Sequence, residues 1–213
     1  MKEDVVQAAC VFLVDDDVNI RTSLARALGL RGYQVKAFES AQAFLDAYEK
    51  TSAGCLILDY GMPQMDGLEL QRHLSERNIK LPIIFITGHG GIPESVQAMK
   101  MGAMDVLEKP FKQSVLIERI DAALEIDRKR RDATQRSSEM WIRFESLTDR
   151  EDEIARLIVS KPGSNSSKDI ARHLDISPRT VDHHRARILE KMDVTSVAQL
   201  VELALKEGLF KDQ

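Results

Sequence analysis

Residues 11–20 read "VFLVDDDVNI", an apolar run that stops abruptly at three consecutive aspartates. Apolar residues without alternation are typical of a strand that is covered on both faces of a sheet. Neighbouring carboxylates repel one another, and burial disfavours their charged forms. The stretch therefore predicts a buried strand leading into a site where Asp15, Asp16 and Asp17 share a positively charged partner.

The first half of the chain alternates short apolar runs with amphipathic segments. The five runs, in order, read CVFLV, YQVKAF, CLILD, PIIFIT and DVLEKP. Five strands that alternate with helices are typical of an α/β fold with a doubly wound, five-stranded parallel sheet. Because both faces of such a sheet are covered, its strands read as continuous apolar runs. We therefore expect this fold for the first half.

The composition of the 213-residue chain fits packed cores beneath a charged surface, with 43% hydrophobic residues, 30% charged residues and a net charge of −4. We expect no membrane segment and a cytoplasmic location, because no apolar run of about 18 residues and no secretory signal is present. Cys10 and Cys55 are expected as buried thiols, with a redox pair across neighbouring strands as the alternative. The negative net charge means that any DNA binding depends on a local patch.

The pattern changes after Phe111, where the chain becomes helical throughout. We expect a first domain over residues 1–126 and a linker helix over residues 127–145. A compact all-α domain is expected over residues 146–213. The linker is predicted to continue a helix that begins near residue 112.

The second domain is predicted to contain four short helices. Ser146 or Thr148, followed by Glu151 or Asp152, resembles a capping box that opens the first helix. The loop KPGSNSS precedes the helix KDIARHL, and the turn DISP leads into the helix RTVDHHRARILEKM. The last helix, SVAQLVELALKEG, is predicted to end at Gly208.

Polar residues stand at the ends of four of the five predicted strands. In chain order they are Asp15 to Asp17, Asp59, Thr87 and Lys109. The carboxyl ends of parallel strands meet at one edge of a sheet, so these groups should converge. Mg²⁺ binds one or two carboxylates together with waters and phosphate oxygens, while lysine and threonine suit a phosphoryl group. Asp17 and Asp66 are also expected as helix N-caps.

Together with these residues, several motifs resemble those of two-component response regulators that join a CheY-like receiver to a LuxR/FixJ-type helix-turn-helix domain. They read VDDD, LDYGMPQMDG, ITGHGG, EKPF, LTDRE, DIARHLDISPRTVDHHRARILEKM and LVELAL. The resemblance implies that a sensor histidine kinase phosphorylates Asp59. It also implies that Asp16 and Asp59 bind Mg²⁺ directly, that Asp15 acts through water, and that the Gly61 carbonyl is a further ligand.

The same resemblance implies that Thr87 and Lys109 bind the phosphoryl oxygens and that the Lys109–Pro110 peptide is cis. The chain would catalyse only its own phosphoryl transfer. Once phosphorylated it would form a homodimer, bind double-stranded promoter DNA and act with RNA polymerase to regulate transcription.

Two features depart from the family pattern. Receivers commonly carry an aromatic residue three positions before the lysine, where this chain has Val106. Signalling is therefore expected to depend on Thr87, the loop after it and the face over residues 92–101. The segment VSKPGSNSSKDIA is about three residues longer than the usual turn, which should affect only a surface loop.

Residues 178–192 are predicted to form the helix that enters the major groove of DNA. Its apolar stripe consists of Val181, Ile188 and Met192, and His184 is expected to pack on that stripe. The opposite side is expected to contact phosphates through Arg179, Thr180, Arg187 and Lys191, and to face bases through Asp182 and His183. Because the local excess of basic residues is small, we expect a dimer that engages two half-sites.

An enzyme is the alternative to a regulator. Haloacid-dehalogenase-type phosphatases also place an Asp-x-Asp motif after their first strand, then a threonine and a lysine, an order that Asp15, Asp17, Thr87 and Lys109 match. Asp15 would then be the nucleophile, but a further acidic pair after a later strand is required, and the chain is helical there. RNA or protein as the ligand of the second domain is a third possibility, which the SPRTVDHH turn and helix disfavour.

Overall fold

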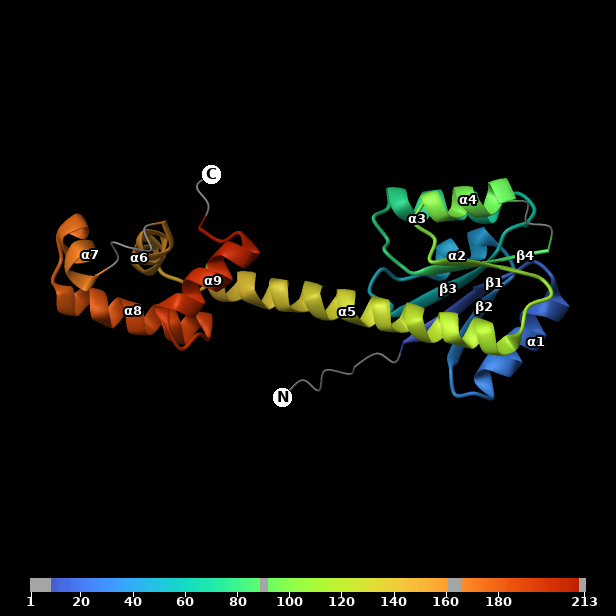
Figure 1. Cartoon of the computed structure of the whole chain (residues 1–213), viewed down its shortest axis with the longest axis horizontal. Helices are drawn as coiled ribbons and strands as arrows, with labels where there is room; N and C mark the ends of the chain where they lie inside the picture. Colours follow the sequence, from blue (N-terminus) through green and yellow to red (C-terminus); the bar gives the residue numbers. More distant parts are fainter. Residues whose placement is uncertain (1–8, 89–91, 161–165, 211–213) are drawn as a thin grey trace. The chain divides into compact units, whose positions relative to one another are not determined.

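The computed structural model describes residues 9–88, 92–160 and 166–210. The chain divides into two compact units, Met1–Arg131 and Asp132–Gln213. Helix α5 (Gln113–Glu145) begins in the first unit and ends in the second (Figure 1). The boundary between the units therefore lies inside this helix. The predicted residues His89 to Gly91 and most of the loop KPGSNSS lie outside the described residues.

The first unit contains a five-stranded parallel sheet with the strand order β2-β1-β3-β4-β5. The strands are β1 (Cys10–Val14), β2 (Gln34–Phe38), β3 (Gly54–Asp59), β4 (Ile83–Thr87) and β5 (Asp105–Glu108). Four more helices precede α5, namely α1 (Val18–Gly29), α2 (Ala41–Ala47), α3 (Gly67–Glu76) and α4 (Ile92–Lys100). Helices α2, α3 and α4 cover one face of the sheet, and α1 and α5 cover the other (Figure 1). The predicted doubly wound fold is confirmed.

The core of the first unit lies on both faces of the sheet, because β1, β3 and β4 are buried along their whole length. Phe12 belongs to the core cluster that includes residues of α2, α3 and α4, whereas its neighbour Val11 belongs to the cluster that includes residues of α1 and α5. The same alternation separates the cysteines. Cys10 belongs to the first cluster and Cys55 to the second, and both are free thiols. A Cys10–Cys55 redox pair is therefore wrong, because the two thiols lie on opposite faces of the sheet.

The ends of the helices follow the predicted capping chemistry. The Asp17 side chain accepts hydrogen bonds from the backbone N–H groups of Asn19 and Ile20 and so caps α1. Asp66 and Glu69 form a complete capping box at α3. The Lys109–Pro110 peptide is cis, as the family resemblance implied. None of the described helices is both long and apolar enough to cross a membrane.

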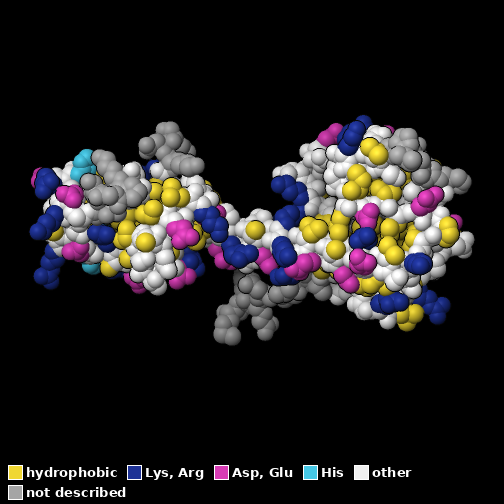
Figure 2. Space-filling model, viewed as in Figure 1, with side chains coloured by type: hydrophobic (Ala, Val, Ile, Leu, Met, Phe, Trp, Pro, Cys, Tyr) yellow, Lys and Arg dark blue, Asp and Glu magenta, His cyan; other side chains and the backbone are white. Residues whose placement is uncertain are grey.

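The second unit contains the end of α5 and four further helices. They are α6 (Asp149–Ser160), α7 (Ser167–Leu174), α8 (Pro178–Met192) and α9 (Val197–Glu207), which confirms the four predicted helices. Thr148 and Glu151 form the capping box of α6, and Gly208 ends α9 with a φ of +69°. Figure 2 shows acidic and basic side chains interspersed on the visible face of each unit.

Replacing Gly54 by alanine is expected to destabilise the first unit severely. Gly54 has a φ of +151°, and an added Cβ there would lie 1.8 Å from the Cys10 carbonyl oxygen. We therefore expect the free energy of unfolding to fall by more than about 4 kcal/mol. Gly32 is the matched control, because its φ is +92° but nothing lies within 4 Å of an added Cβ. Alanine at position 32 should lower the free energy of unfolding by about 1–3 kcal/mol. Urea unfolding measures both losses, and equal values would show that the contact with Cys10 is unimportant.

Candidate functional site

The carboxyl ends of the parallel strands bring a buried acidic pair together with one lysine. Asp15 follows β1 and Asp59 ends β3, and both side chains are almost fully buried. The Lys109 ammonium lies 3.1 Å from Asp15 Oδ2 and 2.6 Å from Asp59 Oδ1. Thr87 is buried at the end of β4, where its carbonyl accepts from the backbone N–H of Lys109 at 2.7 Å. The predicted convergence of these four residues is thus present in the structure.

The loop between β1 and α1 holds the three aspartates in different environments. Asp15 Oδ1 accepts from the backbone N–H of Asp17 at 2.9 Å, so both of its oxygens are engaged. Asp16 is exposed, and its carboxylate forms no hydrogen bond or ion pair with the residues that the structure describes. Asp17 is used by the helix cap. The three neighbouring carboxylates therefore differ in their surroundings: Asp15 pairs with Lys109, Asp16 is exposed, and Asp17 caps α1.

Arg21 also contacts this acidic loop, a role that the sequence did not predict. Its guanidinium Nη1 donates to the carbonyl oxygens of Asp15 at 2.7 Å and Asp16 at 3.2 Å. The arginine thus brings positive charge to the acidic loop but binds main-chain oxygens. Its place near the start of α1, four residues after Asp17, is the signal that could have pointed to it.

Burial and charge oppose each other at the acidic pair. Burial raises the pKa of Asp15, and the neighbouring Lys109 ammonium only partly offsets this effect. Burial lowers the pKa of Lys109, but its hydrogen bonds to Asp59 and Asp15 outweigh burial and leave that pKa above its ordinary value. Lys109 is therefore charged at neutral pH. One ammonium faces two carboxylates, which leaves this edge of the sheet with negative charge that a further cation could balance.

The donor atoms at this edge are oxygens, which hard divalent cations prefer. Within the described ranges, no three His, Cys, Asp or Glu side chains are grouped closely enough to hold a metal ion. Mg²⁺ needs only one or two carboxylates, because waters and phosphate oxygens complete its coordination. The Gly61 backbone N–H donates to Asp59 Oδ2 at 3.0 Å and fixes that carboxylate beside the loop. The buried Asp15 and Asp59 pair therefore supplies the one or two carboxylates that such an ion needs.

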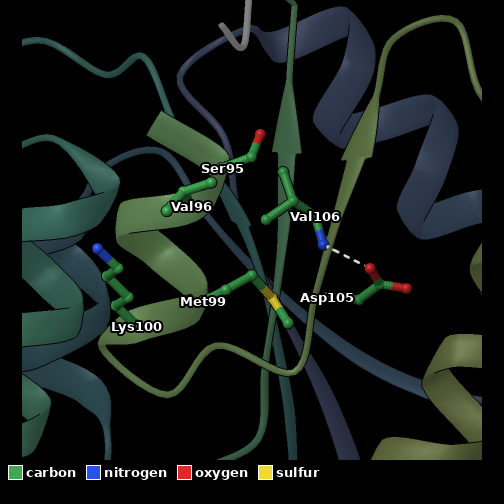
Figure 3. Close-up of a pocket in the computed structure, with 6 residues that line it drawn as sticks. All are labelled: Ser95, Val96, Met99, Lys100, Asp105 and Val106. Carbon is green, nitrogen blue, oxygen red and sulfur yellow. Dashed lines mark hydrogen bonds between the residues drawn. The ribbon is translucent and has the colours of Figure 1, made fainter. Parts of the chain in front are cut away.

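A shallow groove lies between α4 and β5, close to the position where Val106 replaces an aromatic residue. Figure 3 shows the side chains that line it, which are Ser95, Val96, Met99, Lys100, Asp105 and Val106. Val96 and Met99 are 44% and 47% exposed, although both are apolar. The side chains of Ile92 to Glu94, part of the predicted signalling face, lie outside the described residues.

Most of the predicted DNA-contacting side chains are exposed on α8. The exposed ones are Arg179, Thr180, Asp182, His183 and Arg187, whereas the stripe of Val181, Ile188 and Met192 is fully buried, as predicted. His184 is half-buried beside the stripe. Asp182 accepts a hydrogen bond from Ser167 at the start of α7, and Arg185 donates to the same hydroxyl at 2.9 Å.

Lys191 does not point outward, so its predicted orientation toward DNA phosphates is wrong. Its ammonium lies 2.6 Å from Glu151 Oε2 and 2.8 Å from the Ser146 carbonyl oxygen. Glu151 is only 5% exposed. Burial opposes ionisation of Glu151, but the bonds from Lys191 and Thr148 prevail and lower its pKa. The last turn of α8 packs beside the start of α6, so Lys191 is used to neutralise this buried carboxylate.

The phosphatase alternative needs a further strand and an acidic pair beyond Lys109. The regular elements in the described residues after Lys109 are all helices. No sheet edge is therefore available there to carry the second acidic pair.

Comparisons with known proteins cover both units. The sequence model of the response regulator receiver domain matches residues 11–121, and that of "bacterial regulatory proteins, luxR family" matches residues 145–204. Among curated relatives, the transcriptional regulatory protein FixJ of Bradyrhizobium diazoefficiens is 38% identical, over 95% of this chain and 97% of the relative. The response regulator protein TmoT of Ectopseudomonas mendocina is 41% identical, over 95% of this chain and 92% of the relative.

Two solved structures also match along most of the chain. The response regulator StyR has a TM-score of 0.86 and 40% sequence identity, with 93% of this chain and 99% of StyR covered. Full-length FixJ from B. japonicum has a TM-score of 0.57 and 37% identity, with 94% of this chain and 98% of FixJ covered.

Proposed function

The chain belongs to the two-component response regulators that join a receiver domain to a LuxR-type DNA-binding domain and regulate transcription, and from this premise we propose that Asp59 is its phosphoacceptor. The observation that carries the proposal is the buried Asp59 carboxylate at the end of β3, bonded to Lys109 at 2.6 Å. A sensor histidine kinase or a small phosphodonor would supply the phosphoryl group. The family is a regulator rather than an enzyme, so phosphoryl transfer to itself is the only chemistry we assign.

The proposed transfer moves one phosphoryl group between two atoms. An oxygen of the ionised Asp59 attacks phosphorus, an O–P bond forms, and the N–P bond to the phosphohistidine of the kinase breaks. Lys109 and Thr87 are proposed to bind the phosphoryl oxygens, one as a point charge and the other as a hydroxyl donor. The Gly61 N–H holds Asp59 Oδ2 in place. Positioning and electrostatics, more than acid–base chemistry, lower the barrier.

Mg²⁺ is the proposed cofactor. Its proposed ligands are Asp16 and Asp59 directly, Asp15 through water, and the Gly61 carbonyl. When bound, the ion supplies positive charge that offsets the carboxylates and the phosphoryl oxygens. The support is that Asp15 and Asp59 are both buried and share one Lys109 ammonium, because a nearby cation would favour the charged forms that burial disfavours.

Substituting Asp59 by asparagine is expected to abolish phosphorylation. Intact-mass measurement after incubation with acetyl phosphate and Mg²⁺ should show one added phosphoryl group on the wild type. The asparagine variant, or the wild type with excess chelator, should show none, because the nucleophile or the charge that offsets the site is missing. Asp15→Asn separates the two nucleophile assignments, since it should slow labelling without removing the acceptor. Full labelling of Asp59→Asn would overturn the assignment.

We further propose that phosphorylation favours a homodimer through the groove face of α4 and β5. A covalent charge can act only by stabilising one of two states more than the other. The exposed Val96 and Met99 side chains give this face apolar area that a second copy could cover. Figure 2 shows hydrophobic side chains on the visible surface near α3 and α4. Val106 lines the groove in place of an aromatic residue, so coupling to the phosphorylation site would not use a rotating ring there.

Sedimentation with and without beryllofluoride tests the dimer. The association constant of the wild type should rise when this phosphoryl mimic is bound. Met99→Lys should reduce that constant by about tenfold or more, because it places a charge in the apolar patch that the second copy would cover. Leu30→Lys is the matched control, since Leu30 is an exposed apolar residue at the C-cap of α1, the helix that covers the other face of the sheet. An association constant that beryllofluoride does not change would refute the proposal.

The second unit is proposed to bind promoter DNA through the exposed side of α8, and RNA polymerase is the proposed further partner. Arg179, Thr180 and Arg187 are proposed as phosphate contacts, and Asp182 and His183 as base contacts. Lys191 is left out of this set, because Glu151 and Ser146 occupy its ammonium. The support comes from the exposure of these side chains and from the match of the unit to the LuxR family.

Alanine variants of Arg187 and His183 are expected to weaken DNA binding in different ways. Arg187→Ala should weaken binding to cognate and scrambled duplexes alike and lower the salt slope by about one ion. His183→Ala should cost about 1–3 kcal/mol on the cognate duplex only, at about one base pair. Salt titrations on both duplexes measure the two effects. Equal losses for His183→Ala on both duplexes would show that this residue does not read bases.

A further inference from the structure

Helix α5 carries one buried carboxylate whose bonds tie it to the sheet. Asp127 is 1% exposed and lies on the buried stripe of α5 with Leu116, Ile120 and Ala123. Its Oδ2 accepts from the backbone N–H of Gly54 at 2.9 Å and from Arg131 Nε at 2.7 Å. Arg130 pairs with the other oxygen of the same carboxylate.

Arg131 extends these bonds to the loop before β3. Its guanidinium donates to the Thr51 carbonyl at 2.9 Å and also to the Ser52 carbonyl. We call Asp127, Arg130, Arg131, Gly54 and the carbonyls of residues 51 and 52 the Asp127 anchor. All of its members lie in the first unit, and Arg131 is the last residue of that unit.

Apolar packing alone would not require a charge at position 127. A leucine there would continue the apolar stripe, whereas a buried carboxylate is costly unless it is paired and hydrogen-bonded. The anchor meets this condition, because Gly54, Arg130 and Arg131 all donate hydrogen bonds to the Asp127 carboxylate. Gly54 offers its N–H at a point where the backbone approaches Cys10 too closely for any side chain. The carboxylate therefore fixes α5 at one defined place along the sheet.

The anchor also joins α5 to the strand that carries the proposed phosphoacceptor. Strand β3 begins at Gly54, which donates to Asp127, and ends at Asp59, which pairs with Lys109. The first residue of this short, buried strand is thus bonded to α5, and its last residue is the proposed phosphoacceptor.

We propose that the Asp127 anchor holds residues 127–131 of α5 as part of the receiver body and is needed for the state of Asp59 to affect DNA binding by the second unit. This inference rests on the proposed function of Asp59. Asp127 acts in it as a positioning residue, because it touches no reacting group. Without the anchor, residues 127–131 of α5 would separate from the sheet. Phosphorylation of Asp59 at the end of β3 would then no longer affect the conformation of α5.

The test compares two anchor variants with a matched control in the full chain. Asp127→Asn keeps the size of the side chain but removes its charge, and Arg131→Met removes the bonds to the loop. Glu125→Gln is the control, because Glu125 is on the same helix and forms ion pairs with two exposed residues of that helix, Arg128 and Lys129. Hydrogen exchange of residues 124–131 is measured without phosphodonor. Promoter affinity is measured with and without beryllofluoride. Labelling of Asp59 is measured after incubation with acetyl phosphate.

Both anchor variants should exchange these amides faster than the wild type by about tenfold, whereas Glu125→Gln should not. The ratio of DNA affinities with and without beryllofluoride should fall by about fivefold in Asp127→Asn, while labelling of Asp59 stays within about twofold. Faster exchange with an unchanged ratio would reduce the anchor to a local contact. Unchanged exchange would overturn the inference outright. A wild type that is not labelled would refute the proposed function, whereas the exchange result would still decide whether the anchor holds the helix.

Discussion

The ion pairs of Lys109 with Asp15 and Asp59 are the constraint on which the acidic edge of the sheet in the first unit depends. Two carboxylates are buried at the ends of neighbouring strands, and without a cation their repulsion and desolvation would disfavour the charged forms. Lys109 reaches both from the end of β5, while its backbone N–H bonds the end of β4. Strands β1, β3, β4 and β5 are thereby connected at one edge through a single residue.

The second unit uses the same solution for a different purpose. Glu151 is buried at the start of α6, where it also caps the helix, and Lys191 supplies the opposite charge from the last turn of α8. Arg143 on α5 reaches Asp193, the residue that ends α8, at 2.9 Å. Phe144 packs against Phe210 in the same region, with ring centroids 4.8 Å apart. The carboxyl end of α8 is thus bonded to α5 and α6, while the outer side chains of its amino-terminal half, Arg179, Thr180, Asp182 and His183, are exposed.

The sequence allowed the fold and the converging residues to be predicted, because apolar periodicity and strand-end position are local properties. Asp59, Thr87 and Lys109 could be placed at one edge once the strands were recognised as parallel. The orientation of Lys191 could not be predicted in this way. It depends on a buried acid forty residues earlier in the chain, and helical periodicity alone left that lysine on the outer side. Arg21 was missed because its partners are main-chain oxygens, and Asp127 because its bond to the sheet comes from the main-chain N–H of Gly54. Such main-chain partners leave no residue pattern in the sequence.

The continuous helix between the units constrains how the length of the chain can change. Each residue of an α-helix adds about 100° of rotation and about 1.5 Å of rise. One residue inserted between Arg131 and Met140 would therefore turn the helix side that carries Met140 and Phe144, which pack into the second core, relative to the side that carries Asp127. Insertions of about seven residues, close to two whole turns, would nearly restore the helical phase. A change of length within this helix therefore alters helical phase as well as distance along the helix, whereas a loop of the same length has no helical phase.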